Sequence, residues 1–367
     1  MQVIQLINHR DRRGAELFAS RLTEELPRHG DPAQPIDVQL IALAQGRGEL
    51  PVGACLLQGR SLSLPRCLLA AIRLVARLAA LPASEPLILQ ANAGRTLWVA
   101  VFTAWLLRWR GRHVAIVYRQ ASLASPWLRG RRAVTAVQDF FLNHCQAVAS
   151  IAQACADDLR SMHPGLRPPI EVIPNIVPLV PGEVRPWHER PQVLLMVGAF
   201  TPEKDHGLAL QAAGPLLGDN PALLLFFLGD GPEKTRWNSV VASSPWASQV
   251  SFVGNVSADS VAEHMQHARA LILSSRIEGQ PGVIVEALGA GLPVVATSVG
   301  GVPELLADNR GILVAAGDAG ALRAALERVL AGALPDLQAA REHAQLTFAP
   351  AVVAAQFAQL YRRLAAC

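Results

Sequence analysis

Short apolar runs alternate with amphipathic stretches along the whole chain. In the first part the strand-sized runs are 3–8, 36–43, 87–90, 114–118 and 148–151, with helical patterns at 14–26, 97–108 and around 133–144. In the second part they are 192–197, 222–228, 250–254, 270–275, 293–298 and 311–315, separated by helical stretches. Continuous apolar runs of this length are typical of strands buried on both faces of a parallel sheet. The pattern therefore predicts an α/β fold with helices on both faces of parallel sheets.

A proline-rich stretch at 174–191 interrupts this alternation and has the composition of a linker. The chain has 367 residues, which favours about two domains. We therefore predict an N-terminal domain at 1–182 and a C-terminal domain at 183–349. Each is expected to be a doubly wound, Rossmann-like unit, and the two are expected to face each other across a cleft.

Charge differs between the two predicted domains. Residues 1–182 contain 20 Lys and Arg against 12 Asp and Glu, whereas the remainder contains 13 against 17. The five cysteines form no C-x-x-C pair, which favours free thiols over zinc or disulfides. The apolar run 97–107 is too short for a membrane span, and the N-terminus does not resemble a signal peptide. These features predict a cytoplasmic protein.

The segment 278–301 contains two glutamates in a glycine-rich context, EGQPGVIVEALGAGLPVVATSVGG. Glu278 is expected in a loop after a buried strand, and Glu286 in a helix that begins at Pro281 or Gly282. Ionised carboxylates accept hydrogen bonds from hydroxyl groups, whereas the free N–H groups of a helix start favour anions. Lys204 follows the first strand of the same domain, so it is expected at the same sheet edge. Hydroxyl acceptors beside phosphate donors indicate a nucleotide-sugar site.

These residues resemble the signature of the retaining glycosyltransferases of family 4, which have the GT-B fold. Weaker similarity extends over the whole chain, through INHRDRRGAELFASRL, VIPNIV (172–177) and VGAFTPEKDHGLAL. The segment 348–364 is similar to the closing helix of the family. This resemblance implies that residues 350–367 pack back on the first domain, which would bind the acceptor.

The resemblance implies a role for each matching residue. Glu278 would bind the donor sugar and take part in catalysis with Lys204, which would hold the diphosphate. Glu286 would bind the ribose hydroxyls. The donor-binding set is completed by Gly14, Ala199, Gly279, Gly282 and Val283. The chain departs from the family at Ala199, where an arginine is usual, at Ala152, where a serine is common, and at Arg119-Gln120, where a histidine is often found. Arg119, Asn175 or an arginine of 10–13 could supply additional contacts.

The expected activity is transfer of a hexose from a nucleoside-diphosphate sugar to a hydroxyl of a glycan or lipid-linked acceptor, in cell-surface polysaccharide or glycolipid synthesis. Retention is implied by the resemblance. No Asp-x-Asp occurs, so a divalent ion that bridges the diphosphate to paired aspartates is not expected. No cofactor is expected either, because the nucleoside-diphosphate sugar is a substrate. Two alternatives stay open: a nucleotide-sugar-binding protein with impaired catalysis, and a GT-B sugar-nucleotide epimerase. Each glutamate by itself could also be an ordinary loop or helix residue.

The segment 104–134 contains seven arginines and three tryptophans but no acidic residue. Arginines are attracted to anionic lipid, and tryptophans favour the level of the headgroups. We therefore predict peripheral binding to the inner face of an anionic membrane. The alternative is a solvated arginine face over core tryptophans. Nucleic acid is disfavoured as a partner because the second domain is acidic.

Overall fold

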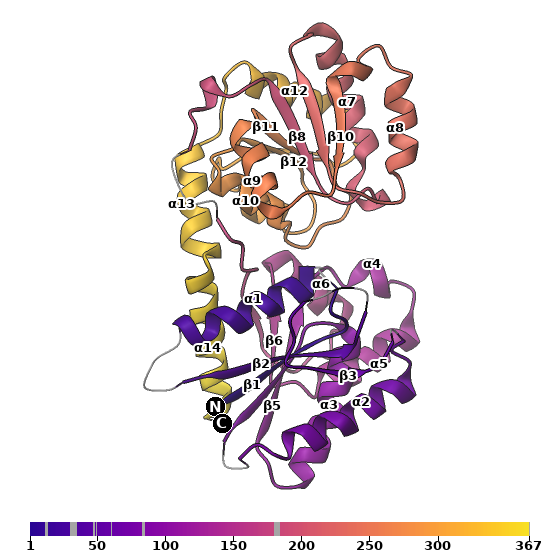
Figure 1. Cartoon of the computed structure of the whole chain (residues 1–367), viewed down its shortest axis with the longest axis vertical. Helices are drawn as coiled ribbons and strands as arrows, with labels where there is room; N and C mark the ends of the chain where they lie inside the picture. Colours follow the sequence, from indigo (N-terminus) through magenta and orange to yellow (C-terminus); the bar gives the residue numbers. More distant parts are fainter. Residues whose placement is uncertain are drawn as a thin grey trace. The chain divides into compact units, whose positions relative to one another are not determined.

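The computed structural model describes residues 1–11, 14–29, 35–46, 48, 50–59, 61–82, 85–179 and 184–366. It divides into unit 1, Met1–Ile176 with Pro350–Cys367, and unit 2, Val177–Ala349. Each unit is a parallel sheet covered by helices on both faces (Figure 1). The predicted fold class, two Rossmann-like α/β domains, is confirmed.

In unit 1 the parallel strands follow the order β3-β2-β1-β4-β5-β6-β7. Their bounds are β1 Gln2–Ile7, β2 Asp37–Ala44, β3 Ala54–Leu57, β4 Leu87–Ala91, β5 Val114–Gln120, β6 Ala147–Ser150 and β7 Ile170–Val172. The helices are α1 Gly14–His29, α2 Leu64–Leu78, α3 Gly94–Trp109, α4 Ser125–Leu128, α5 Arg132–Leu142, α6 Gln153–Met162 and α14 Pro350–Ala365. Every residue of β1, β4 and β5 is buried, as expected for strands covered on both faces.

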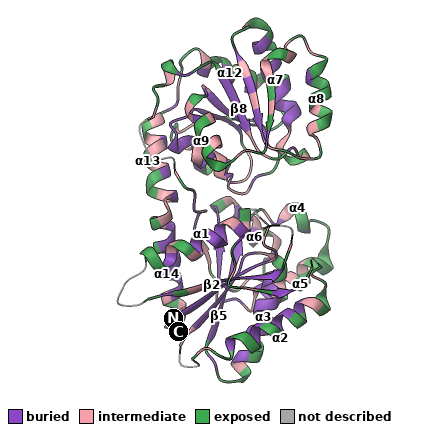
Figure 2. Ribbon diagram, in the orientation of Figure 1, coloured by how far each residue is buried: buried purple, intermediate pink, exposed green. Residues whose placement is uncertain are grey.

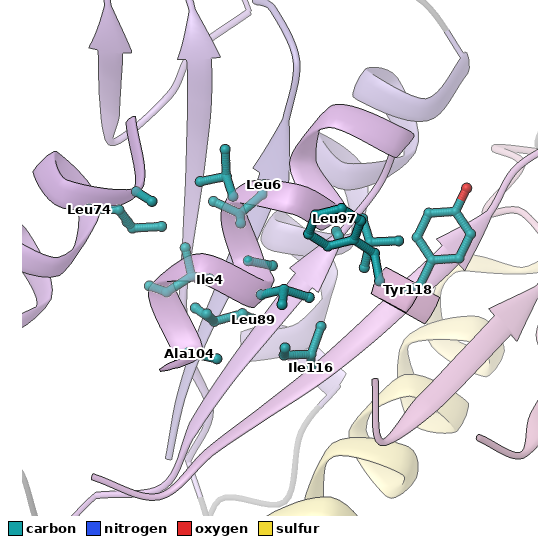
Figure 3. Close-up of a cluster of buried hydrophobic side chains, with 14 of the residues drawn as sticks. Ile4, Leu6, Leu74, Leu89, Leu97, Ala104, Ile116 and Tyr118 are labelled. Carbon is teal, nitrogen blue, oxygen red and sulfur yellow. The ribbon is translucent and has the colours of Figure 1, made fainter. Parts of the chain in front are cut away.

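Two apolar clusters cover the two faces of the sheet in unit 1. One joins the strands to α2 and α3 through residues such as Leu6, Leu74 and Leu97 (Figure 3). The other joins them to α1 and α14, where the rings of Phe18 and Phe357 lie 5.5 Å apart. The final helix therefore belongs to the core of unit 1, although it follows unit 2 in the sequence.

In unit 2 the parallel strands follow the order β10-β9-β8-β11-β12-β13. Their bounds are β8 Val193–Val197, β9 Leu224–Leu228, β10 Val250–Gly254, β11 Ala270–Leu273, β12 Val294–Thr297 and β13 Ile312–Val314. The α-helices are α7 His206–Asp219, α8 Lys234–Ala242, α9 Ala258–His267, α10 Gly282–Gly289, α11 Val302–Leu306, α12 Ala319–Leu330 and α13 Leu337–Phe348. Short 3-10 turns lie at Trp187–Glu189, Pro202–Lys204 and Ala247–Gln249. Buried residues line the sheet and the inner helix faces (Figure 2).

The order of the strands reverses at one point in each sheet. In unit 1 the chain runs outward from β1 to β2 and β3, then returns to the other side of β1 as β4. In unit 2 the corresponding neighbours are β8 and β11. Open α/β sheets bind ligands outside the carboxyl ends of the two strands at such a reversal. Each unit therefore has one position where a ligand is expected.

One prediction about chain organisation requires correction, and one segment was left without a prediction. The division between the units lies between Ile176 and Val177 rather than after residue 182, because Val177 is buried in the core of unit 2. Leu179 also packs there, so closely that a Cβ at Gly289 would lie 2.8 Å from it. The sequence analysis assigned no element to residues 44–86, where β3 and α2 lie. Helix α2 leaves apolar residues on its outer face, with Leu64 and Ile72 more than half exposed.

Candidate donor site

Lys204 and Glu278 meet at the strand reversal of unit 2. Lys204 lies in the turn after β8, and Glu278 lies in the loop after β11. The Nζ of Lys204 donates to Oε1 of Glu278 at 2.6 Å. The pair joins residues far apart in the sequence because β8 and β11 are neighbours in the sheet. Glu278 is buried, whereas Lys204 is partly exposed.

Serine hydroxyls at the end of β11 position both partners. The Oγ of Ser274 donates to the carbonyl oxygens of Lys204 and Asp205, at 3.0 and 2.9 Å. The Oγ of Ser275 donates to Oε1 of Glu278 at 2.6 Å. Among the residues that the structure describes, the hydrogen bonds recorded for this carboxylate fall on Oε1, so Oε2 can accept from a ligand. The sequence analysis missed both serines, although their place directly after a buried strand is a usable signal.

Arg276 ties the same two loops together. Its Nε donates to Oδ2 of Asp205 at 2.7 Å, and its backbone N–H donates to the carbonyl of Glu203 at 2.7 Å. Asp205 adopts a left-handed conformation, with φ 46°, and its Oδ1 accepts from the N–H of Leu208 to cap α7. The Arg276 side chain is otherwise exposed, so a second cation stands beside the Lys204 loop. The sequence analysis did not identify it.

Glycines allow the loops of the site to approach one another. A Cβ at Gly300, where φ is +53°, would lie 1.8 Å from the carbonyl oxygen of Glu278. The next residue, Gly301, donates its N–H to the carbonyl of Gly279 at 2.9 Å. In the other loop the aliphatic stem of Lys204 covers Gly198, and the following residue, Ala199, is exposed. The position where the family usually has arginine therefore lies in the Lys204 loop.

Helix α10 begins at Gly282, with Pro281 as its N-cap residue, as predicted. Gly282 and Val283 in its first turn are partly exposed, and so is Glu286 in the next turn. A Cβ at Gly282 would meet no atom nearer than 4.0 Å, so internal packing does not require glycine there. The first turn of a helix presents N–H groups at the positive end of the dipole. An anion can therefore approach the start of α10 directly.

His206 follows the Lys204 loop in the chain and is the first residue of α7. Its ring is buried and stacks on Phe200 with 3.9 Å between centroids. Burial, with a smaller contribution from the charge of Lys204, lowers the pKa of His206 from 6.5 to about 4. The folded protein therefore holds His206 neutral in a range of pH where an unfolded chain would protonate it.

This pKa predicts a loss of stability in acid. Between pH 6.5 and 4 the unfolded state binds more protons than the folded state, so the free energy of unfolding falls as the pH falls. From pH 7 to pH 5 the expected loss from this group is roughly 2 kcal/mol. Urea unfolding of the wild type and of His206→Phe at the two pH values measures it. The variant should lose roughly 2 kcal/mol less than the wild type; equal losses would contradict the assignment.

The three remaining candidate residues lie in unit 1. Gly14 begins α1, and a Cβ there would meet nothing within 4 Å. Arg119 donates to Oδ1 of Asn175, and its guanidinium lies over the ring of Phe18 at 3.5 Å. Burial lowers the pKa of Arg119 to about 9. The expectation that Arg119 could contact the donor needs correction, because its side chain is 1% exposed and forms part of the core. Of the arginines at 10–13, Arg12 and Arg13 lie outside the described residues.

The pairing of Lys204 with Glu278 restricts the chemistry that fits this site. An ammonium group binds phosphate, and a carboxylate accepts hydrogen bonds from hydroxyl groups. Because the two are in contact, a molecule that uses both must carry a phosphate directly beside a polyol. Within the described ranges, no group of three or more His, Cys, Asp and Glu side chains is gathered as a metal ion would require.

Comparison with known proteins relates most of unit 2 to a protein family. Residues 183–346 match the family model of glycosyl transferases group 1. The amylovoran biosynthesis glycosyltransferase AmsK of Erwinia amylovora is 29% identical over 48% of this chain and 46% of its own length. The 2-deoxystreptamine glucosyltransferase of Streptomyces kanamyceticus is 28% identical over 57% of this chain and 58% of its own length. The chain thus spans about half the length of these curated relatives.

Solved structures share the fold of the whole chain. The Anabaena protein Alr3699/HepE, crystallised in complex with UDP, superimposes with a TM-score of 0.77 at 18% identity, over 99% of this chain and all of that one. The lipopolysaccharide outer core galactosyltransferase WaaB superimposes with a TM-score of 0.76 at 16% identity, over 99% of this chain and all of that one. By fold the chain is therefore of the GT-B class, and by sequence residues 183–346 are related to the group 1 glycosyl transferases.

Proposed function

We propose that the protein is a glycosyltransferase that moves a hexose from a nucleoside-diphosphate sugar to a hydroxyl of a glycan or lipid-linked acceptor. The contact of Lys204 Nζ with Glu278 Oε1 at the strand reversal carries this proposal. The ammonium group can bind a phosphate, and the carboxylate beside it can accept hydrogen bonds from hydroxyl groups. In a nucleoside-diphosphate sugar the sugar is likewise bonded directly to the β-phosphate. The relatives named as glycosyltransferases support it. The product would be a cell-surface polysaccharide or a glycolipid, and the relative AmsK is likewise named for a biosynthetic role, that of amylovoran.

In the proposed reaction, the bond between the anomeric carbon and the β-phosphate oxygen breaks while the acceptor oxygen bonds to the same carbon. The acceptor hydroxyl gives its proton to the departing phosphate oxygen, and the nucleoside diphosphate leaves with the bonding electrons. Lys204 and the N–H groups of Gly282 and Val283 would stabilise the charge that grows on the phosphate. Glu278 would orient the sugar, and Glu286 the ribose. Retention of configuration and independence of metal are parts of this proposal that rest on the family resemblance and the lack of Asp-x-Asp.

A thermal-shift screen of nucleotide sugars, followed by an assay for release of nucleoside diphosphate, tests the proposal. A donor at 100 times its Kd should stabilise the protein by about 2.7 kcal/mol. Slow release of nucleoside diphosphate without an acceptor would support a transferase. Binding with no release, in the presence or absence of glycan and lipid acceptors, would favour a binding protein instead. If no nucleotide sugar stabilises the protein, the donor assignment fails.

We also propose that unit 1 binds the surface of an anionic membrane. Trp109 is 84% exposed and Trp127 is 66% exposed, and the nearby Arg110, Arg129, Arg131 and Arg132 are exposed as well. Trp109 and Trp127 are therefore not core residues, whereas Trp105 packs against Phe140 and His144. Three of its arginines have structural roles instead, since Arg108, Arg112 and Arg119 are bonded inside unit 1. None of the described helices is both long enough and apolar enough to cross a membrane.

Cosedimentation with lipid vesicles is expected to show this attraction. Each exposed arginine near an anionic leaflet contributes about 1 kcal/mol, so Arg129/Arg131/Arg132→Gln should weaken binding roughly 100-fold. Binding of the wild type should require anionic lipid and decline as salt is added. The matched control is Arg236/Arg323/Arg328→Gln, which removes three exposed arginines from unit 2. Equal binding to neutral and anionic vesicles would contradict the proposal.

A further inference from the structure

A pocket of about 460 Å³ opens at the edge of the sheet in unit 1. It is lined by residues 38–40 of β2, by the second half of α1, by the loop 51–53 and by Arg77 at the end of α2. Strand β3 pairs with β2 only from Ile41 onward, so the described sheet has no further strand beside this part of β2. Backbone groups at an open sheet edge can bind a ligand. The volume is also within the range of pockets that bind small molecules.

The pocket lies at the amino ends of the parallel strands. Strand β2 begins at Asp37 and β3 at Ala54, and the helices that join parallel strands return to this edge with their second halves. Open α/β sheets bind the ligands of their reactions at the opposite edge, outside the carboxyl ends of the strands. The pocket is therefore separate from the strand reversal of unit 1, and the proposed reaction gives it no role.

A buried hydroxyl group opens into this pocket. Ser20 is 8% exposed, and its Oγ has no hydrogen-bond partner among the described residues. This oxygen is not one of the fully enclosed unpaired atoms of the described chain, so a molecule in the pocket can reach it. Helical hydroxyl groups often donate to a carbonyl one turn earlier, as Thr23 does to Ala19 at 2.8 Å. The Oγ of Ser20 instead remains available to donate to a ligand or to accept from it.

Two side chains of opposite charge line the pocket. Glu24 is exposed and forms no ion pair with any residue that the structure describes, whereas its neighbour Glu25 pairs with Arg28. Arg77 donates from one guanidinium nitrogen to the carbonyl of Gly53 at 3.3 Å and keeps its other donors. Because the two charges oppose each other, the pocket concentrates neither anions nor cations. It suits a neutral ligand or a zwitterion.

The neutral groups of the pocket favour a neutral polyol over a zwitterion. An amino acid would pair its ammonium with Glu24 and its carboxylate with Arg77, and would leave the hydroxyl groups of Ser20 and Thr23 unused. A sugar ring carries a hydroxyl on most of its carbons, so it can bond to the carboxylate, the guanidinium and both side-chain hydroxyls together. The apolar side chain of Val52 offers contact to the C–H groups of the same ring.

We propose that this pocket is a carbohydrate-binding site that holds a neutral hexose, free or as one unit of a glycan, through Ser20, Glu24 and Arg77. The inference goes beyond the proposed function, because a sugar in this pocket takes no part in transfer. A glycan held here stays attached to the enzyme while another of its ends reacts, which raises the local concentration of that end. This consequence, unlike the binding itself, rests on the proposed function.

Saturation-transfer NMR with the methyl glycosides of glucose, galactose and mannose tests the proposal, with glycine as the zwitterion for comparison. At least one glycoside should bind. Glu24→Ala should weaken its binding roughly tenfold and Ser20→Ala about threefold, as expected for the loss of a charged and of a neutral hydrogen bond. Neither change should lower the unfolding temperature, because neither side chain has a partner among the described residues. Binding of no glycoside, or of glycine alone, would overturn the assignment.

Matched variants locate the bound sugar. Glu25→Ala removes the adjacent acid of α1, which does not line the pocket, and should bind the glycoside normally. The donor site could also take a hexose, so binding in the pocket has to persist in Glu278→Ala. Binding that is lost in Glu278→Ala, or that is unchanged in both pocket variants, would overturn the assignment. A loss in Glu25→Ala as large as that in Glu24→Ala would do the same.

The thermal shift by a nucleotide sugar separates this inference from the proposed function. If a glycoside binds in the pocket and no nucleotide sugar stabilises the protein, the carbohydrate site stands and the donor assignment fails. If nucleotide sugars bind and no glycoside does, only the carbohydrate site fails.

Discussion

Lys204→Ala is expected to lower the rate of transfer roughly 10- to 100-fold, because a charge-assisted hydrogen bond contributes about 1.5–3 kcal/mol. The affinity for the donor should fall much less. Negative charge on the leaving phosphate grows as the glycosidic bond breaks, so an ammonium group at this position binds the transition state more strongly than the donor. Steady-state kinetics with a saturating acceptor, together with calorimetry of the donor, separate the two effects.

The structure provides both a refined variant and a control for this experiment. Lys204→Met keeps an aliphatic stem over Gly198 and removes only the charge, so it should show the same loss as Lys204→Ala. Lys234 is the only other lysine of the chain, and it pairs with Asp230 on the surface. Lys234→Ala should keep nearly full activity. Turnover within twofold of the wild type in both Lys204 variants would show that the phosphate does not bind here.

The parts of this site that the sequence analysis predicted are those set by local pattern. A lysine after one buried strand and a glutamate after another are visible in the sequence, and parallel strands bring such loops to one edge of a sheet. The start of α10 could be placed because Pro281 and Gly282 interrupt the apolar run. What joins Lys204 to Glu278 is the neighbourhood of β8 and β11, which depends on the order of strands and not on either segment alone.

The missed features depend on contacts between distant segments. The sequence does not distinguish the hydroxyl of Ser275 from other serine hydroxyls, because its role depends on the hydrogen bond to Glu278 in the folded protein. Arg119 has the same charge in the sequence as the exposed Arg129, and it is removed from solvent by the packing of residues such as Phe18 and Asn175 around it. In the same way, the exposure of Trp109 follows from which face of α3 meets the sheet. Apolar residues surround that helix on all sides, so its pattern could not identify the buried face.

Glu286→Ala is expected to weaken binding of nucleoside diphosphate and of the intact donor alike, each roughly 10- to 100-fold, because the ribose is common to both ligands and a charged acceptor contributes about 1.5–3 kcal/mol. Glu278→Ala should weaken the intact donor and slow transfer while leaving the nucleoside diphosphate bound at least as tightly as in the wild type. The reason lies in the ion pair: without Glu278, no carboxylate competes with phosphate for Nζ of Lys204.

Calorimetry of both ligands with both variants decides whether the two glutamates have separate roles. Glu278→Gln keeps an acceptor for Ser275 and removes the charge. With the loop held in this way, its affinity for the intact donor should fall as much as that of Glu278→Ala. Glu327, exposed on α12 beside Arg323, provides a control that should bind both ligands normally as Glu327→Ala. Equal losses for both glutamates and both ligands would rule out the division of roles. A gain in diphosphate affinity in Glu278→Ala is the most specific outcome, because it follows only if the phosphate binds at the Lys204 ammonium that Glu278 now occupies.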